Sequence, residues 1–219
     1  MKENCFRTNV QYKLEVIIIL NKKQLSSQQT KQKVAEAART LFGQKGYAST
    51  SIEDIVSATQ ISKGNIYYHF KNKEGLFLYL LEEWTLEWAE QFQAKKARYH
   101  TVKEQIIALV EHFVVDGFHH PLTRATNEFY ATELITSPNQ DKIEEMMHMY
   151  LRNYEELLAE GMASGEFKPD DARLLSIILE GMLAGIEFST NKLELDEALN
   201  LYRKAIHVFL YGIAETNRS

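Results

Sequence analysis

The sequence predicts an all-α protein. Apolar residues recur every three or four positions along most of its 219 residues, the spacing of one helix face. Only ten glycines and three prolines interrupt these stretches, and no segment shows the strict alternation of apolar and polar residues that is typical of strands. An apolar content of 45% can form a sizeable core, in one large domain or in a small domain followed by a larger one.

Charge divides the chain into two regions. Residues 1–75 hold 12 Lys and Arg against 6 Asp and Glu, a net charge of +6, whereas residues 76–219 hold 13 against 24, a net charge of −11. Because lysine and arginine supply the affinity for polyanions, this difference favours a nucleic-acid-binding head joined to a body with another task. Chance variation of charge along the chain is the alternative.

Residues 1–25 are interpreted as an N-terminal extension without an assigned function, either disordered or not part of the natural protein. Its apolar cluster, Leu14 and residues 16–20, is far below the ~20 residues that span a membrane. A secretory signal needs a longer apolar core and a cleavage site with small residues. We therefore expect no membrane partner.

Residues 26–73 are expected to form a small domain of three helices. The first should cover about residues 28–44, with Ser26 and Gln29 as a capping box and Gly46 as the terminator. Its apolar residues lie on one helix face at Val34, Ala37, Ala38, Leu41 and Phe42.

Two short helices then follow, separated by a tight turn. Thr50 with Glu53 is a capping-box pattern for the first, Thr59 and Gln60 make the turn, and Ser62 caps the second. The residues expected to face the core are Ile52, Ile55, Val56, Ile61, Ile66 and Phe70. This arrangement is typical of the helix-turn-helix, whose second helix enters the DNA major groove.

The outward residues of that second helix suit DNA contact. Gly64 lets the backbone approach a base edge, Tyr67 can contact a base, and Tyr68 and His69 can donate to phosphate. For one of the two tyrosines, packing within the domain is the open alternative. The predicted DNA-binding residues are Thr50, Ser51, Ser62, Lys63, Gly64, Asn65, Tyr67, Tyr68, His69 and Lys73.

Residues 74–219 are expected to form a larger helical domain. A helix capped by Asn72 should run to about Lys96 and join head to body. Further helices are expected near residues 102–116, 122–136, 138–163, 170–190 and 195–214. Their start and stop signals are Pro121, Ser137–Pro138 with Gln140, Gly165 and Pro169–Asp170.

The last two helices are predicted to form a dimer interface, as a four-helix bundle around a two-fold axis. Gly181 and Gly185 permit close approach of a neighbouring helix. Packing within one subunit is the alternative. The apolar positions are Leu175, Ile178, Leu179, Met182 and Ile186 on the first helix, and Tyr202, Ile206, Phe209, Leu210 and Ile213 on the second.

Within about residues 30–81 three motifs follow one another without a gap. They are Ala38-x-x-Leu41-Phe42 with Gly46-Tyr47, Thr50-Ser51-Ile52-x-x-Ile55, and Ser62-Lys63-Gly64-x-Ile66-Tyr67-Tyr68-His69-Phe70. This pattern resembles the DNA-binding head of TetR/AcrR-family transcriptional repressors. The resemblance implies a TetR-like homodimer that binds double-stranded, near-palindromic operator DNA. It also implies that a small molecule bound to the C-terminal domain releases the DNA.

The body resembles most the branch of this family that senses quaternary ammonium compounds and other drugs. By that match Trp88, Tyr130 and Tyr150 take drug-contacting positions. The cation-neutralising carboxylates do not carry over, because the matching positions hold Trp84, Thr85, Gly117 and Met147. A neutral lipophilic effector and a cationic one are therefore equally expected, with Glu83, Glu87 or Glu128 as substitutes in the second case. The predicted ligand-binding residues are Trp84, Trp88, Phe113, Glu128, Tyr130, Met147 and Tyr150, with ordinary core packing as the alternative.

Other classes of function find less support. No nucleophile elbow, phosphate-binding glycine loop or pair of catalytic carboxylates is present, so we expect no enzyme and no cofactor. His112, His119 and His120 lack the spacing of a metal site. The single cysteine, Cys5, excludes an internal disulfide and favours the cytoplasm. A DNA-binding protein of the same fold without an inducer, acting through protein partners, remains the alternative.

Overall fold

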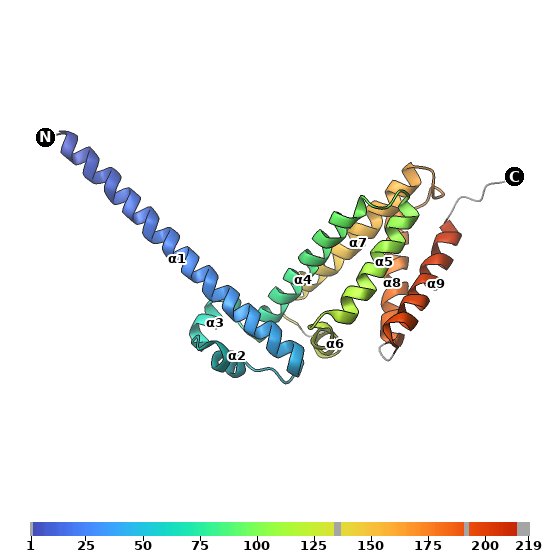
Figure 1. Cartoon of the computed structure of the whole chain (residues 1–219), viewed down its shortest axis with the longest axis horizontal. Helices are drawn as coiled ribbons and strands as arrows, with labels where there is room; N and C mark the ends of the chain where they lie inside the picture. Colours follow the sequence, from blue (N-terminus) through green and yellow to red (C-terminus); the bar gives the residue numbers. More distant parts are fainter. Residues whose placement is uncertain (1, 134–136, 191–192, 214–219) are drawn as a thin grey trace. The chain divides into compact units, whose positions relative to one another are not determined.

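The computed structural model describes residues 2–133, 137–190 and 193–213, apart from the side chains of residues 2–23, 147, 150, 187–190 and 213. The described chain is a series of helices joined by short connections (Figure 1). They are α1 (Lys2–Lys45), α2 (Ile52–Thr59), α3 (Lys63–Phe70), α4 (Lys73–Lys96), α5 (Val102–His119), α6 (Thr123–Thr132), α7 (Gln140–Ala163), α8 (Ala172–Thr190) and α9 (Leu195–Ile213). The predicted all-α fold is confirmed.

Two compact units make up the chain. Unit 1 extends over Met1–Leu80 and unit 2 over Leu81–Ser219. α4 begins in unit 1 and ends in unit 2, so one continuous helix belongs to both. The predicted functional boundary between residues 73 and 74 falls at the start of this helix and stays a prediction.

Unit 1 packs α1, α2 and α3 around aromatic and aliphatic side chains. The rings of Phe42 and Phe77 lie edge to face with their centroids 4.9 Å apart, and the Tyr47 ring lies 4.9 Å from that of Phe77. The other buried residues include Val34, Ala38, Ile52, Ile55, Ile66, Phe70, Leu76 and Leu80. Most apolar positions that predicted these helices therefore lie on their buried sides.

The start of α1 differs from the prediction. The helix runs from Lys2 rather than from about residue 28, so Ser26 and Gln29 lie inside it and cap nothing. The Ser26 carbonyl accepts a hydrogen bond from the Thr30 hydroxyl at 2.9 Å, as in a continuing helix. Residues 2–25 contain no glycine or proline, so they hold no strong breaker, and a serine costs little inside a helix.

Unit 2 packs α5 against α7 and α9, and α8 against α7 and α9. Its buried residues include Ile106, Leu109, Val114, Tyr154, Leu158, Phe167, Leu179, Leu183, Tyr202 and Ile206. Gly161 on α7 touches Phe167 so closely that a Cβ atom there would lie 2.2 Å from the ring. Gly165, with φ +79°, follows the end of α7 as predicted.

Helices α5 to α9 begin within two residues of their predicted starts. The cap of α7 differs, because its N-cap is Asn139 rather than Ser137–Pro138. The Ser137 hydroxyl instead accepts a hydrogen bond from the Asn139 amide at 2.9 Å, which shapes the turn before the helix. No helix in the described part of the chain is long and apolar enough to cross a membrane.

The apolar residues of α8 and α9 face two ways. Of the positions predicted for the dimer interface, Leu175, Leu179, Tyr202, Ile206 and Leu210 are buried inside unit 2, which corrects the prediction for them. Ile178 is 57% exposed. Periodicity identifies an apolar helix face, but a helix with two such faces does not reveal which one its own domain covers.

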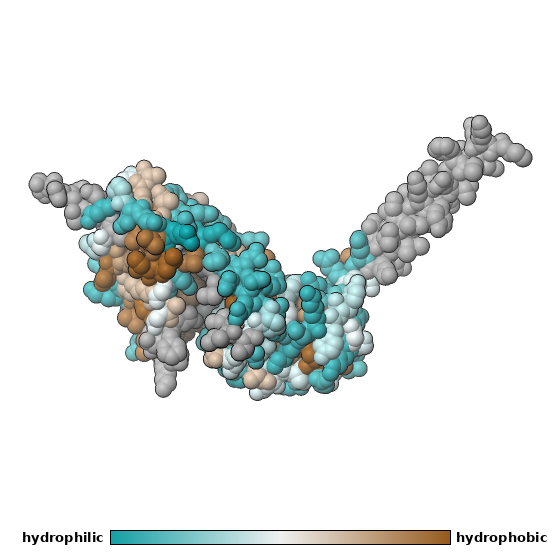
Figure 2. Space-filling model, turned by 180° about the vertical axis from the view of Figure 1, so that it is seen from behind, coloured by the Kyte–Doolittle hydropathy of each residue, from teal (hydrophilic) through white to brown (hydrophobic). Residues whose placement is uncertain are grey.

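A second apolar face remains exposed on the same two helices. It consists of Leu174, Ile177 and Ile178 on α8 and Leu201, Val208 and Tyr211 on α9, and we call it the α8–α9 outer face. Figure 2 shows apolar side chains gathered on the surface of unit 2. Patches of this kind are common at protein–protein interfaces.

Candidate DNA-binding and effector sites

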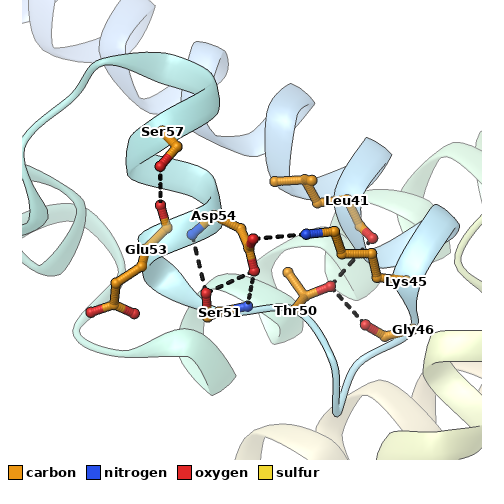
Figure 3. Close-up of polar contacts among 8 residues, drawn as sticks. All are labelled: Leu41, Lys45, Gly46, Thr50, Ser51, Glu53, Asp54 and Ser57. Atoms are coloured by element: carbon orange, nitrogen blue, oxygen red, sulfur yellow. Dashed lines mark hydrogen bonds and ion pairs between the residues drawn. The ribbon is translucent and has the colours of Figure 1, made fainter.

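The start of α2 is fixed by a network that ties it to the end of α1 (Figure 3). Ser51 is the N-cap: its hydroxyl accepts from the Asp54 amide at 3.1 Å, and the Asp54 carboxylate accepts from the Ser51 amide at 2.9 Å. Lys45 donates to the same carboxylate at 2.7 Å. The hydrogen bond from Lys45, followed by those from Ser51, holds the pKa of Asp54 well below its usual range.

Thr50 lies inside unit 1 rather than on its surface. Its side chain is 1% exposed, and its hydroxyl donates to the backbone carbonyls of Gly46 and Leu41 at 2.7 and 3.2 Å (Figure 3). The predicted capping box of Thr50 and Glu53 is therefore shifted by one residue, to Ser51 and Asp54. Burial gives Thr50 an internal hydrogen-bonding role in place of the predicted DNA contact.

The turn between α2 and α3 places α3 with one side in the core. Gln60 adopts the left-handed conformation, with φ 59°, and Ser62 caps α3 by accepting from the Asn65 amide at 3.3 Å. Ile66 and Phe70 are buried, as the sequence predicts. The opposite side of the helix is thereby turned to solvent.

That exposed side, which we call the α3 outer face, consists of Lys63, Gly64, Asn65, Tyr67 and Tyr68. Tyr67 is 39% and Tyr68 80% exposed, so neither tyrosine is buried by unit 1. A Cβ atom at Gly64 would meet no described atom within 4 Å. The face is therefore open, aromatic and free of steric constraint at its glycine.

Other predicted DNA-binding residues have partners within unit 1. Lys63 forms an ion pair with Glu53, which raises the lysine pKa and lowers the glutamate pKa. Lys73 donates to the Tyr47 carbonyl at 3.0 Å, with its ammonium 4.2 Å from the centroid of the tyrosine ring. His69 is half-buried beside Tyr68. Lys63 belongs to the α3 outer face and His69 borders it. Lys73 joins the start of α4 to Tyr47, and its predicted DNA contact stays a prediction.

In unit 2, the aromatic residues of α4 lie against α5. The Trp84 indole donates to the Asp116 carboxylate at 2.5 Å and stacks on His120, with ring centroids 3.7 Å apart and planes 6° from parallel. The Trp88 ring is nearly parallel to that of His112 at 5.7 Å. Two of the predicted ligand-binding residues are thus placed side by side on α4.

The remaining predicted ligand-binding residues are less concentrated. Phe113 is half-buried and packs against the core of unit 2. On α6, Glu128 forms an ion pair with Arg124 at 3.1 Å, and Tyr130 is 38% exposed. The side chains of Met147 and Tyr150 lie outside the described residues.

Four polar residues of unit 2 are further candidates for ligand contact that were not predicted from the sequence. Asp116 and His120 hold Trp84, and Gln105 and His112 place polar atoms in the interior of unit 2. One signal was present: Gln105 and His112 are seven positions apart on the apolar stripe of α5. Polar residues at such positions are uncommon, because burial of a polar group requires a partner.

Comparison with known proteins identifies the class to which this fold and these sites belong. Residues 34–80 match the family described as bacterial regulatory proteins, tetR family, and residues 84–215 match the QacR-like protein, C-terminal region. The chain belongs to the TetR family of transcriptional regulators. Within that family its C-terminal region is QacR-like, so the chain is a regulator and not an enzyme.

Individual relatives agree with this assignment. The HTH-type transcriptional regulator QacR of Staphylococcus aureus is 31% identical over 84% of this chain and 98% of its own length. The fatty acid metabolism regulator protein of Bacillus subtilis is 28% identical over 68% of this chain and 77% of its own. A TetR-family regulator from Pectobacterium atrosepticum shares the fold, with a TM-score of 0.73, 21% identity and coverage of 89% and 98%. Regulators of this family bind operator DNA and small effectors as dimers.

Proposed function

We propose that this chain is a homodimeric repressor in the cytoplasm whose α3 helices bind a near-palindromic operator. A small lipophilic effector in unit 2 releases the DNA. The observation that carries the DNA-binding part is the α3 outer face, where exposed aromatic residues surround a glycine that the domain itself does not need.

The presence of glycine at position 64 supports DNA contact, because glycine is less stable in a helix than alanine. A glycine inside a helix is about 0.5–1 kcal/mol less favourable than alanine, and here alanine would meet no steric obstacle within unit 1. The α3 helix therefore carries a destabilising residue without an internal reason. Close approach of a DNA backbone or base edge to the start of α3 supplies the missing reason.

The α8–α9 outer face supports the dimer. Its six apolar side chains are exposed in the single chain, and they lie in stripes along both helices. Gly181 and Gly185 belong to the same side of α8, and among the described atoms none would lie within 4 Å of a Cβ at either position. A second copy of this face, related by a two-fold axis, would cover it and use the room at the glycines.

The effector part is supported by the arrangement of α4. Its second half carries Trp84 and Trp88 into unit 2, where they contact α5, and ion pairs of Glu82 with Lys142 and of Lys96 with Glu160 join it to α7. Because α4 is shared by both units, a ligand that changes its packing can act on the head. Release requires only that the ligand prefer one conformation, by a few kcal/mol of differential affinity.

The DNA-binding part is tested by selecting duplexes from a random library with the purified full-length chain. We expect enrichment of a near-palindrome, and an affinity for it that falls steeply as salt rises. Absence of any enriched sequence would contradict the proposal. A second experiment distinguishes a sensor from an inducer-free regulator: operator affinity is measured again in the presence of lipophilic compounds. The affinity of an inducer-free regulator should not change with any of them.

The dimer is tested by sedimentation of an Ile178→Glu variant. A charge at the centre of the α8–α9 outer face should give monomers at concentrations where the wild type is dimeric. The matched control is Ser164→Glu, an exposed position at the end of α7. A dimeric Ile178→Glu protein would show that another surface joins the subunits.

A further inference from the structure

Two buried polar atoms on α5 have no hydrogen-bond partner among the described residues. They are Oε1 of Gln105 and Nε2 of His112. The two residues are seven positions apart, so they lie on the same side of the helix, about 10 Å from each other along its axis. A buried polar atom without a partner is unfavourable, and native structures rarely keep one without a reason.

The state of the His112 ring decides what its free nitrogen can bind. The imidazole makes a hydrogen bond to the backbone of Trp88 that favours the protonated ring, so it donates there, and Nδ1 is the donor because Nε2 has no partner. Burial lowers the pKa of the ring, which is therefore neutral near pH 7. In a neutral ring with a proton on Nδ1, Nε2 is a hydrogen-bond acceptor.

Both orphaned atoms are thus acceptors, since the side-chain oxygen of Gln105 also accepts. A molecule that satisfies them must bring hydrogen-bond donors, such as a hydroxyl or an N–H group. A quaternary ammonium group has no N–H and cannot donate to either atom.

The charges near this part of α5 also disfavour a fixed cation. The positive charge of Lys95 lowers the pKa of His112, so it opposes a second positive charge there. Asp116 acts in the opposite direction, but its carboxylate already accepts from the Trp84 indole. Glu128, a predicted substitute for the missing carboxylates, is paired with Arg124.

We infer that His112 Nε2 and Gln105 Oε1 are polar contacts of the effector, and that the effector is an uncharged lipophile carrying hydroxyl or N–H donors. This inference rests on the proposed function, because it assumes that an effector enters unit 2. The aromatic rings of Trp88 and Phe92, both near-parallel to His112, supply the apolar surroundings for such a molecule.

Three probes with one ten-carbon chain test the inference by calorimetry on the full-length protein. Decan-1-ol carries a donor, its methyl ether carries none, and decyltrimethylammonium carries a fixed charge without a donor. We expect the alcohol to bind about tenfold more tightly than the ether and also more tightly than the cation. Each probe is also titrated into the complex with the selected operator.

Two variants assign the preference to the named atoms. His112→Phe and Gln105→Leu keep the bulk but each removes one acceptor. Because the single hydroxyl of decan-1-ol donates one hydrogen bond, the alcohol-to-ether ratio of affinities should fall toward one in the variant that lacks its acceptor and stay unchanged in the other. An unchanged ratio in both variants would overturn the inference. Because Gln105→Leu removes an unpaired polar atom, this ligand-free variant should melt about 2–4 °C higher than the wild type. His112→Phe also loses the hydrogen bond to the Trp88 backbone, so its melting temperature should rise less. Gln91→Leu, at an exposed position of α4, is the control and should keep the ratio.

An ether that binds as tightly as the alcohol, or a cation that binds more tightly, overturns the inference. If the ether or the cation still releases the operator, the protein is a sensor, but its effector needs no hydrogen-bond donor. If no probe binds while the operator does, the assigned effector class is wrong. A protein that selects no operator fails at the proposed function itself, independently of all three probes.

Discussion

The two units hold their candidate sites in opposite ways. In unit 1, the polar residues around the start of α2 are hydrogen-bonded to one another and to the end of α1, and the α3 outer face is exposed. In unit 2, aromatic rings cover one another and two acceptor atoms lie buried without a partner among the described residues. Under the proposed function, the DNA-binding surface would be complete in the free protein, whereas the effector site would be completed by its ligand.

The largest effect is expected from a substitution at the centre of the α3 outer face. Tyr67→Ala should cost about 1–3 kcal/mol of operator binding free energy and reduce selectivity at one base pair, because the proposal places the exposed part of this side chain against a base edge. Fluorescence anisotropy with selected and mismatched duplexes measures both effects. Tyr99→Ala, outside this face, is the control. Intact selectivity in Tyr67→Ala would place the reading surface elsewhere.

Thr50 tests whether the polar residues at the start of α2 have an internal role. Thr50→Val removes the hydroxyl that donates to Gly46 and Leu41 and should lower the free energy of unfolding by about 0.5–1.5 kcal/mol. Urea unfolding gives the value, and Ser49→Ala, which removes a hydroxyl from the exposed neighbouring position, should change little. The folded Thr50 variant should keep its operator affinity. Weaker DNA binding with unchanged stability would restore Thr50 to the interface.

Gly64 should show opposite effects on stability and binding. Gly64→Ala should raise the free energy of unfolding by about 0.5–1 kcal/mol, since alanine favours a helix and meets no obstacle in unit 1. The same methyl group should weaken operator binding by obstructing the approach of DNA. Unfolding and anisotropy on one sample give the two numbers. A Gly64→Ala variant that is more stable and binds the operator as tightly as the wild type would remove the main support for α3 as the helix that contacts DNA bases.

The smallest effect concerns pH and sharpens the description of unit 2. Burial lowers the folded-state pKa of His112 below its ordinary value, so the unfolded chain binds protons that the folded chain does not. The stability from this residue is complete above a pH of about 6.5 and is lost as the pH falls toward the folded-state pKa. His112→Phe should lose less stability than the wild type between about pH 7.5 and about pH 5.5. Equal losses would show that His112 is not held neutral.

Local sequence spacing was enough to predict most of unit 1. The apolar residues of α2 and α3 and the cap at Ser62 depend on neighbours within four positions, and these agree with the structure. The capping box was displaced by one residue because Thr50 and Ser51 are both good caps, and only the packing of Thr50 against the end of α1 separates them.

Unit 2 was less predictable because its contacts join distant residues. Asp116 lies 32 positions from Trp84, and no local pattern pairs them. α8 and α9 each carry two apolar faces, and the sequence cannot show which one the domain covers. The buried acceptors of Gln105 and His112 become visible only when burial and hydrogen bonds are known together.

The most direct measurement is the coupling between the two sites in the full-length dimer. Operator affinity is measured with and without saturating decan-1-ol, and decan-1-ol affinity with and without saturating operator. If effector and DNA favour different conformations of one protein, each should weaken the other by the same factor. Operator and alcohol affinities that do not depend on each other would contradict regulation of the head by a ligand in unit 2.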